Sequence, residues 1–343
     1  MTGQAAAPWL ISAEDFPRSG SRREQLAFLV GYAILAPSGH NTQPWLFRVS
    51  ETQIDVYADR TRALPVVDPF DRELTISCGA AISFLELAAR RFSLAATVTL
   101  LPDNSEPDLL ARVAFDSGSP TTQSENQLFE AIGIRRTNRT SFAMEPVPKD
   151  FAEACTACAE RQGIEIRLLE TQRARSELAR LVSEGDRMQF HDPRFRRELA
   201  CWVHSKRLGS RDGMSGESFG LPDILAGVGR MVIRSFDIGE GVAASDEDKV
   251  LAGTPALLVF GCKETPEEWL KVGRALGEIS LLATAHGLSI SYLNQPIETD
   301  ALRPEVRSIA DLRLEPQLLL RVGRATGSVN PTARRDPAEV MLD

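Results

Sequence analysis

Two stretches of the chain repeat one pattern, an apolar helix followed by a strand. Residues 71–101 carry a nearly all-apolar segment around Cys78–Ala89 and then the strand-like run Ala95–Leu101. Residues 273–298 follow the same order and contain the shorter strand-like run Ser289–Leu293. A helix that is apolar on all sides is usually buried, so each pattern predicts a helix inside a core. We interpret the similarity as an internal duplication; the alternative is chance similarity between two ordinary helix–strand units.

A polar loop follows another apolar run near the amino terminus. The run Leu26–Ala36 predicts a buried helix, which ends at Pro37 because proline disfavours the helical conformation in the residue before it. Trp45–Val49 then has the pattern of a strand. The intervening loop carries five side chains that form hydrogen bonds: Ser38, His40, Asn41, Thr42 and Gln43. A loop held by prolines at both ends suits a planar ligand with a polar edge.

These segments resemble the nitroreductase family of FMN enzymes. The order of a helix, the sequence Ala36-Pro37-Ser38 to Trp45 and a strand is similar to the family's flavin-contacting loop. Residues 135–142, followed by Pro146-Val147-Pro148, resemble the signature Arg-Arg-Ser-x-Arg-x-Phe, which normally opens a nitroreductase chain. A degraded copy occupies residues 18–22. The resemblance covers most of the chain and is closest to the Acg-type proteins, which are fused nitroreductase-like chains.

The resemblance implies an α+β, nitroreductase-like fold in which two fused repeats form an intramolecular pseudo-dimer. The first repeat would span residues 1–120 and the second residues 121–343, with a turn-rich linker at 117–126. Ordinary nitroreductases are dimers whose two flavin sites are each built from both subunits. Because the second half lacks the Pro-Ser loop, the resemblance implies one FMN per chain. The fusion of both subunits in one chain implies a monomer, with higher assembly left open.

FMN presents a polar pyrimidine edge and a phosphate, and the resemblance assigns residues to both. For the edge these are Pro37, Ser38, His40, Asn41 and Gln43. Asn41 is the best match to the family, whereas His40 has the alternative role of stabilising the loop.

The phosphate requires cations in a fixed geometry, and the arginine fork matches phosphate oxygens. Residues that alternate in an extended segment face the same side. The resemblance therefore assigns the phosphate to Arg135, Thr137 and Arg139, together with Arg334 and Arg335. The neighbouring Arg136 belongs to the same motif, although a surface charge is its simpler interpretation.

Flavin N5 exchanges hydride and needs a nearby hydrogen-bond donor. The resemblance implies a backbone amide at Asn294 and Gln295, where the family often has an acid followed by glycine. Because a flavin carries the chemistry itself, we name no catalytic acid or base.

Two functions fit these observations. The first is an FMN-binding oxidoreductase that transfers hydride from NAD(P)H to nitroaromatics, quinones or related acceptors. The second is an FMN-storing or sequestering protein with little turnover. A long insertion at about 184–249 fits no core element, and its glycine-rich part, Leu208–Ile233, predicts a lid over the flavin. The alternative is an additional pair of packing helices.

The remaining signals favour a soluble cytoplasmic protein without metal. The five cysteines are scattered and odd in number, which fits a reducing compartment. Cys155 and Cys158 lie three apart in the predicted helix Asp150–Gln162, where packing is favoured and a redox role is the alternative. The histidines show no metal-ligand spacing, the net charge of −8 argues against nucleic acid, and no apolar stretch is long enough to span a membrane. Ser21-Arg22-Arg23 reads either as an export signal or as the first turn of a helix.

Overall fold

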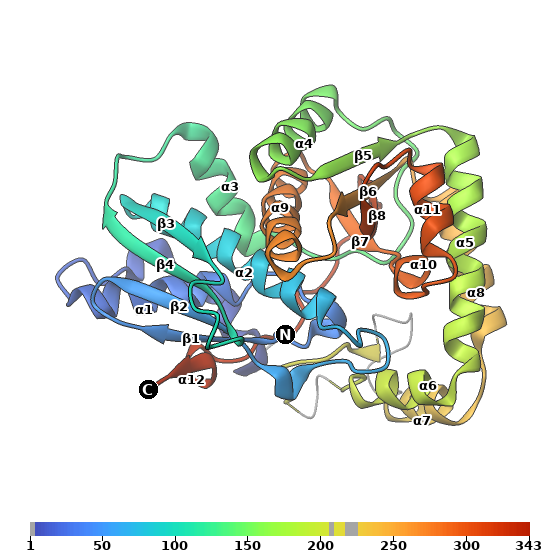
Figure 1. Ribbon diagram of the computed structural model, residues 1–343, viewed down its shortest axis with the longest axis horizontal. Helices are drawn as coiled ribbons and strands as arrows, with labels where there is room; N and C mark the ends of the chain where they lie inside the picture. Colours follow the sequence, from blue (N-terminus) through green and yellow to red (C-terminus); the bar gives the residue numbers. More distant parts are fainter. Residues whose placement is uncertain (1–3, 206–208, 217–225) are drawn as a thin grey trace.

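The computed structural model describes residues 4–205, 209–216 and 226–343. Two sheets lie on either side of a pair of long central helices (Figure 1). Sheet A consists of β1 (Trp45–Val49), β2 (Gln53–Ala58), β3 (Leu94–Leu100), β4 (Leu109–Ser117) and β9 (Met341–Leu342). Sheet B consists of β5 (Glu165–Leu169), β6 (Ala256–Cys262), β7 (Ser289–Tyr292) and β8 (Glu315–Gly323).

Helices precede, connect and cover these strands. In the amino-terminal part of the chain they are α1 (Arg22–Ala33), α2 (Arg72–Arg91) and α3 (Gln123–Ile134). In the middle they are α4 (Lys149–Gln162), α5 (Gln172–His191), α6 (Pro193–Cys201), α7 (Ala226–Ser235) and α8 (Gly239–Ala252). Near the carboxyl terminus they are α9 (Pro266–Ala285), α10 (Gln295–Glu298), α11 (Arg303–Ile309) and α12 (Pro337–Val340). Short 3-10 helices span Gln4–Leu10, Ala13–Asp15, Gly39–Asn41 and Arg60–Arg62.

The two sheets share one strand order. Sheet A runs β3-β4-β2-β1 and sheet B runs β7-β8-β6-β5, with β9 added outside β1. All neighbouring strands are antiparallel except β9, which pairs with β1 in parallel. A long helix connects the equivalent strands in each sheet, since α2 joins β2 to β3 and α9 joins β6 to β7. A register shift also interrupts β2 after Val56 and β6 after Phe260.

The central helices α2 and α9 contact one another through glycine. A Cβ on Gly79 would lie 2.5 Å from the carbonyl oxygen of Leu270, and one on Gly273 would lie 2.1 Å from that of Ile76. Both helices are buried along most of their length, as the all-apolar patterns predict. The two backbones therefore approach more closely than any larger residue would allow.

The ends of several predicted elements differ from the structure for local reasons. Helix α1 ends at Ala33, because the amides of Leu35 and Ala36 bond three residues back, to Tyr32 and Ala33. The predicted linker 117–126 is too long, since α3 begins at Gln123. Its start is marked by a capping box between Thr122 and Glu125, in which each residue satisfies a backbone amide of the other.

The residues Ser21-Arg22-Arg23 open α1. Ser21 is the N-cap, and its Oγ accepts from the Glu24 amide at 3.2 Å while Glu24 Oε2 accepts from the Ser21 amide at 2.6 Å. This is the helical alternative for that sequence. No helix among the described residues has the length and apolar character needed to cross a bilayer.

The long insertion is the connection between β5 and β6. Residues 170–255 form it, whereas residues 50–52 suffice between the equivalent strands β1 and β2. The predicted bounds 184–249 therefore begin inside α5 and end inside α8. Helices α5 and α8 pack on one face of sheet B, and α6 and α7 form a smaller separate cluster. Of the predicted lid, residues 209–216 and 226–233 are described; residues 208 and 217–225 lie outside the described residues.

Candidate functional site

The loop that follows α1 has a strained backbone. His40, Asn41 and Gln43 have φ angles of 48°, 56° and 52°, in the left-handed region that residues other than glycine rarely adopt. Ser38 stabilises this conformation, because its Oγ accepts a hydrogen bond from the Gln43 amide at 3.0 Å. Strain of this kind persists only where the surroundings enforce it, and it is frequent at functional sites.

Arg334 fixes Asn41 to the end of α1. It donates to Asn41 Oδ1 at 2.8 Å and to the carbonyl oxygens of Leu35 and Ala36 at 3.2 and 3.1 Å. These carbonyls follow the last turn of α1, where acceptors lack intrahelical partners and the helix dipole is negative. The buried guanidinium therefore acts as a cap supplied from the far end of the chain.

Arg335 fixes Gln43 in a similar way. Its backbone amide donates to Gln43 Oε1 at 2.8 Å, and its guanidinium donates to the Gln43 carbonyl at 3.1 Å. The same guanidinium forms a buried ion pair with Asp59 at 3.2 Å. Arg335, like Arg334, has much of its hydrogen-bonding capacity committed to the protein.

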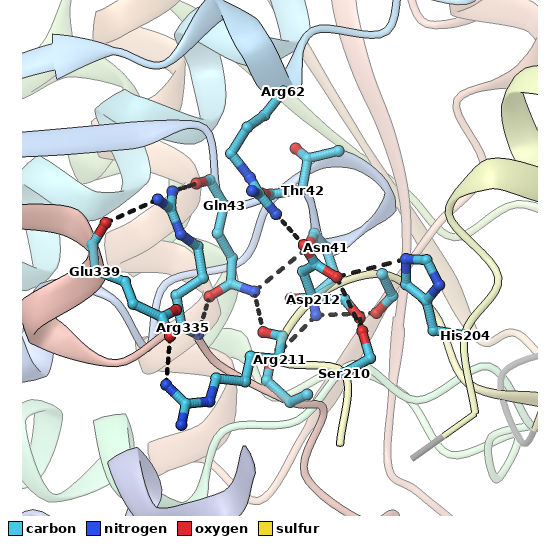
Figure 2. Close-up of polar contacts among 12 residues, drawn as sticks. Asn41, Thr42, Gln43, Arg62, His204, Ser210, Arg211, Asp212, Arg335 and Glu339 are labelled. Atoms are coloured by element: carbon cyan, nitrogen blue, oxygen red, sulfur yellow. Dashed lines mark hydrogen bonds and ion pairs between the residues drawn. The ribbon is translucent and has the colours of Figure 1, made fainter. Parts of the chain in front are cut away.

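Residues 209–216, which we call the strap, cover the polar side of the loop (Figure 2). Asn41 Nδ2 donates to the Gly213 carbonyl at 2.9 Å, and the Gly213 amide donates to the Asn41 carbonyl at 3.2 Å. Gln43 Nε2 donates to the Arg211 carbonyl at 2.9 Å. The side-chain amides predicted to meet a ligand edge are thus hydrogen-bonded to the strap backbone.

Arg62 joins the loop and the strap (Figure 2). Its guanidinium donates to the Thr42 carbonyl and forms an ion pair with Asp212 of the strap. It also stacks 5.4 Å from the ring centre of Trp202. These contacts give the strap a charged anchor in addition to its backbone hydrogen bonds.

The segment Arg135–Arg139 is extended, as predicted, and lies beside β7. Thr137 forms a parallel bridge with Ile290, whose carbonyl oxygen accepts from the Asn138 amide at 3.0 Å. Arg135 Nη1 lies 3.5 Å from Thr137 Oγ1. These two side chains therefore share one side of the segment.

Arg135, Arg139 and Arg321 of β8 form a set that we call the cationic cluster. Arg135 and Arg321 are 2% and 1% exposed, and the Nε atom of each lacks a hydrogen-bond partner. Arg139 contacts the strap through Met214 Sδ at 3.8 Å. Within the described ranges, no carboxylate forms an ion pair with any of the three. Buried cations are rarely left unpaired, so this cluster is suited to an anionic ligand.

Desolvation controls protonation around the cluster. Burial raises the pKa of the Tyr292 phenol to about 12, although Arg135 and Arg139 oppose this shift. Burial lowers the pKa of His40 to about 4, and repulsion from Arg139 lowers it further. His40, Arg139 and Tyr292 nevertheless keep partial accessibility. Groups that are both accessible and strongly desolvated are expected to face an interior space rather than the outer surface.

Asn294 and Gln295 follow β7 and begin α10. In the described structure neither backbone amide donates a hydrogen bond, because the first amides of a helix lack intrahelical acceptors. Asn294 Nδ2 donates to Glu73 Oε1 of α2 at 3.1 Å. Glu73 also borders the loop, since a Cβ on Gly39 would lie 3.6 Å from its Oε2. The segment and the loop therefore meet at Glu73.

The structure brings most of the predicted residues together but gives two of them other surroundings. The Arg136 guanidinium lies 4.2 Å from the ring centre of Trp9 and bonds nearby carbonyl oxygens. The Gln295 side chain points to Asp186, at 3.0 Å, and not to the loop. The ligand-binding role of each residue predicted from the sequence stays a prediction.

Three residues of the site were not selected from the sequence. Arg321 interrupts the apolar run of β8, and a single cation in such a run is the signal that identifies it. Glu73 stands in the same way at the start of buried α2. Tyr292 ends β7 and has no distinguishing local pattern. The strap carbonyls give no side-chain signal at all.

Metal and thiol chemistry receive no support from the described residues. No group of three or more His, Cys, Asp or Glu side chains gathers there as a metal site. Cys155 and Cys158 are buried free thiols, and burial raises the pKa of both, that of Cys155 to about 12. Thiols that ionise so poorly are weak nucleophiles, which favours the packing interpretation.

Comparison with known proteins places this architecture. No family model matches the chain. It is 30% identical over 328 residues to "Putative NAD(P)H nitroreductase Rv3131" of Mycobacterium tuberculosis, covering 93% of this chain and 91% of that protein. It is 26% identical over 337 residues to "Putative NAD(P)H nitroreductase acg" of the same species, covering 91% and 93%.

One solved structure extends the similarity to the fold. A crystal structure described as a putative nitroreductase from Anabaena variabilis aligns with a TM-score of 0.50 at 10% identity. The alignment covers 93% of this chain and 91% of that one. The 30% identity over nearly the full length of its relative shows that the chain belongs to the nitroreductase family.

Proposed function

We propose that this protein is an FMN-binding oxidoreductase that transfers hydride from NAD(P)H to nitroaromatics, quinones or related acceptors. The observation that carries the proposal is the cationic cluster of Arg135, Arg139 and Arg321, in which Arg135 and Arg321 have buried, unpaired Nε atoms and no member forms an ion pair with a carboxylate among the described residues. A phosphate would satisfy these donors through charge-assisted hydrogen bonds. Membership of the nitroreductase family points to FMN as its source.

The residues around the cluster fit the remaining parts of FMN. The loop at 37–43 supplies side-chain amides for a polar ring edge, and Asn294 and Gln295 supply two unpaired backbone amides. His40, with its pKa near 4, is neutral at physiological pH and would act as a hydrogen-bonding group without charge. When bound, FMN would supply the hydride chemistry; the chain would bind it, orient it and exclude water.

A spectrum and a titration test this function. The purified protein should be yellow or become so with added FMN, at about one flavin per chain, because the resemblance yields one complete loop. NADH or NADPH should bleach the bound flavin, and a nitroaromatic or quinone should restore its colour. A protein that ignores added FMN would overturn the proposal.

The same reasoning supports an internal pseudo-dimer. The two sheets share strand order, the long connecting helix and the position of a register shift. These shared features favour two fused repeats, at about 1–120 and 121–343, over chance similarity. Because α2 and α9 already pack against one another, we propose that the chain is a monomer in solution. Light scattering that returned a dimer mass would contradict this.

FMN storage remains the second candidate, and the strap is the observation that favours it. The strap bonds the amides of Asn41 and Gln43, which are the groups assigned to the flavin edge. A strap that stays closed would limit both flavin exchange and access of substrate. The two candidate functions, oxidoreductase and FMN storage, therefore differ in how readily the strap opens.

Two glycines of the strap separate these candidates. Gly213 and Gly209 both have positive φ, at 68° and 74°, so alanine strains the backbone at either position. Only at Gly213 would the new Cβ also meet other atoms, His204 Cδ2 at 2.3 Å and the Trp202 carbonyl at 2.6 Å. If the protein stores FMN, Gly213→Ala should greatly accelerate flavin release and reduction, and Gly209→Ala should do so much less. Rapid reduction of the unaltered protein would favour the enzyme.

A further inference from the structure

Helix α5 packs against the backbone of the segment that begins α10. Gly185 makes this possible, since a Cβ there would lie 2.9 Å from both the carbonyl carbon and the Cβ of Gln295. Contacts this short require backbone movement, because neither atom is the end of a flexible side chain. The position of Gln295 is therefore set in part by the absence of a side chain at Gly185.

Two aspartates of the β5–β6 connection hold the Gln295 side chain. Gln295 Nε2 donates to Asp186 Oδ1 of α5 at 3.0 Å and to Asp246 Oδ2 of α8 at 3.2 Å. Asp186 is 1% exposed, and its Oδ2 has no hydrogen-bond partner. Asp246 forms an ion pair with Lys249 at 2.7 Å, whereas no cation among the described residues forms one with Asp186. Burying Asp186 beside another acid is unfavourable, so packing alone does not account for this arrangement.

The other side of the segment is fixed as well. Asn294 Nδ2 donates to Glu73 Oε1 at 3.1 Å, and Asn294 Oδ1 accepts from the Leu319 amide of β8 at 3.0 Å. The Asn294 side chain and Gln295 Nε2 are thus bonded by the protein, whereas Gln295 Oε1 and the two backbone amides are unpaired in the described structure. The side-chain hydrogen bonds of Asn294 and Gln295 therefore fix the direction of the two backbone amides.

We propose that Gly185 and Asp186 of α5, with Asp246 of α8, are positioning residues that set the direction of the Asn294 and Gln295 backbone amides. The β5–β6 connection would then tune the flavin's redox behaviour through the contacts that α5 and α8 make with Gln295, in addition to any covering role of its strap. This inference rests on the proposed function, because it presumes FMN in front of these amides. Hydrogen bonds to the ring nitrogens are among the means by which a protein tunes a flavin.

A pair of glycine substitutions tests the steric part. Gly185→Ala should displace Gln295, whereas Gly241→Ala, on α8, meets no atom within 4 Å and is the matched control. The readouts are the visible spectrum of bound FMN, its midpoint potential and the rate of reduction by NADPH. Gly185→Ala should shift the spectrum and change the equilibrium between oxidised and reduced bound FMN about two- to tenfold, as expected for one weakened neutral hydrogen bond. Reduction should slow by up to about 100-fold through misplacement.

Aspartate variants test the polar part and keep the inference falsifiable if Gly185→Ala fails to fold. Asp186→Ala should shift the potential in the same direction as Gly185→Ala. Asp186→Asn retains an acceptor for Gln295 Nε2 and should restore values close to those of the unaltered protein. Asp248→Asn, at an exposed position of α8, should change nothing.

The outcomes separate this inference from the proposed function. If the unaltered protein binds no FMN, both the proposed function and the inference that rests on it are wrong. If it binds and reduces FMN, but Gly185→Ala and Asp186→Ala leave spectrum and potential unchanged, the positioning role is wrong and the proposed function stands. Equal effects of Asp186→Ala and Asp186→Asn would likewise contradict positioning through the Gln295 hydrogen bond.

Discussion

The arginines of this site divide by what their nitrogen atoms already bond. Arg334 and Arg335 are held by carbonyls, Asn41, Gln43 and Asp59, although Arg334 Nε has no hydrogen-bond partner and burial lowers the pKa of Arg334 well below its ordinary value. Arg135 bonds the carbonyl of Leu35 and Arg321 bonds those of Asn138 and Thr140, neither forms an ion pair with a carboxylate among the described residues, and burial lowers the pKa of each. A lowered arginine pKa records the free-energy cost of keeping a cation away from water. An anionic ligand beside Arg135, Arg321 or Arg334 would relieve that cost.

The first prediction uses neighbouring arginines of one segment. Arg139→Gln should raise the dissociation constant of FMN about 10- to 100-fold, because a charged hydrogen bond contributes about 1.5–3 kcal/mol. Arg136→Gln should leave affinity nearly unchanged, since its guanidinium stacks on Trp9. Fluorescence titration measures both, with melting temperatures as a check on folding. Equal losses for the two variants would contradict the assignment.

The second prediction concerns pH and His40. Its pKa is about 4 in the folded protein, below the 6.5 of an unperturbed histidine, so between these values the unfolded chain binds more protons. Stability from this residue is therefore present above about pH 6.5 and is lost as the pH falls towards 4, by up to about 3 kcal/mol. His40→Asn, which tolerates the positive φ, should abolish that loss.

Urea unfolding at several pH values measures this effect as a difference between the two proteins. Asp186 acts in the opposite sense, because its pKa is raised to about 7 by burial and by Asp246. It is common to both proteins and cancels in the comparison. Parallel stability curves from pH 4 to 7 would show that His40 is not desolvated.

At the residue scale, the sequence predicts what local pattern encodes. The loop from Pro37 to Gln43 and the alternating triplet ending at Arg139 both depend on spacing within a few residues. The contact of Asn41 with Gly213 joins residues 172 positions apart, and that of Arg334 with Asn41 joins residues 293 apart. Such contacts follow from tertiary packing, so no local pattern could predict them.

Elements are predictable here where their composition is extreme. The all-apolar runs of α2 and α9 leave burial as their only stable environment, and both lie at the centre of the molecule (Figure 1). The β5–β6 connection is harder to delimit, because α5 is amphipathic and packs on sheet B like an ordinary core helix, whereas α8 adds only Val250 to that core. Its composition predicts a lid or an additional pair of packing helices, and α5 joins the core of sheet B.

The third prediction tests the glycine contact between these helices. Gly273→Ala should destabilise the protein by about 1–3 kcal/mol or more, because the added methyl group overpacks against backbone. The new Cβ would lie 2.1 Å from the Ile76 carbonyl oxygen. Gly133→Ala on α3, with no atom within 4 Å, should instead stabilise by up to about 1 kcal/mol through helix propensity. Denaturant unfolding of both variants provides the test, and a neutral Gly273→Ala would mean that the helices can separate at no cost.

At the scale of the whole molecule, two segments of residues 121–343 lie with sheet A. Helix α3 adds Phe129, Ala131 and Ile132 to the core beside that sheet, and the carboxyl terminus leaves sheet B to add β9 beside β1. Trp9 also donates to the Thr332 carbonyl at 2.8 Å, which ties the two ends of the chain together. The repeated helix–strand pattern predicts two similar halves, but it carries no information on which terminal segments of one half pack against the other. A boundary at residue 120 therefore separates the two sequence repeats, but segments from beyond it pack with sheet A in the structure.

The last prediction follows from that packing. The bond between Pro120 and Thr121 lies after the end of β4 and before the start of α3, and Ser119 and Pro120 are exposed. A chain cut at this bond should reassemble when the fragments 1–120 and 121–343 are expressed together. The first fragment alone lacks α9 and β9, so the buried face of α2 and the edge of β1 would be uncovered, and it should aggregate. A cut between Gly79 and Ala80, inside buried α2, is the control and should yield no complex. Co-purification with a tag on one fragment measures assembly, and a fragment 1–120 that is soluble, monomeric and cooperatively folded would show that the halves are independent domains.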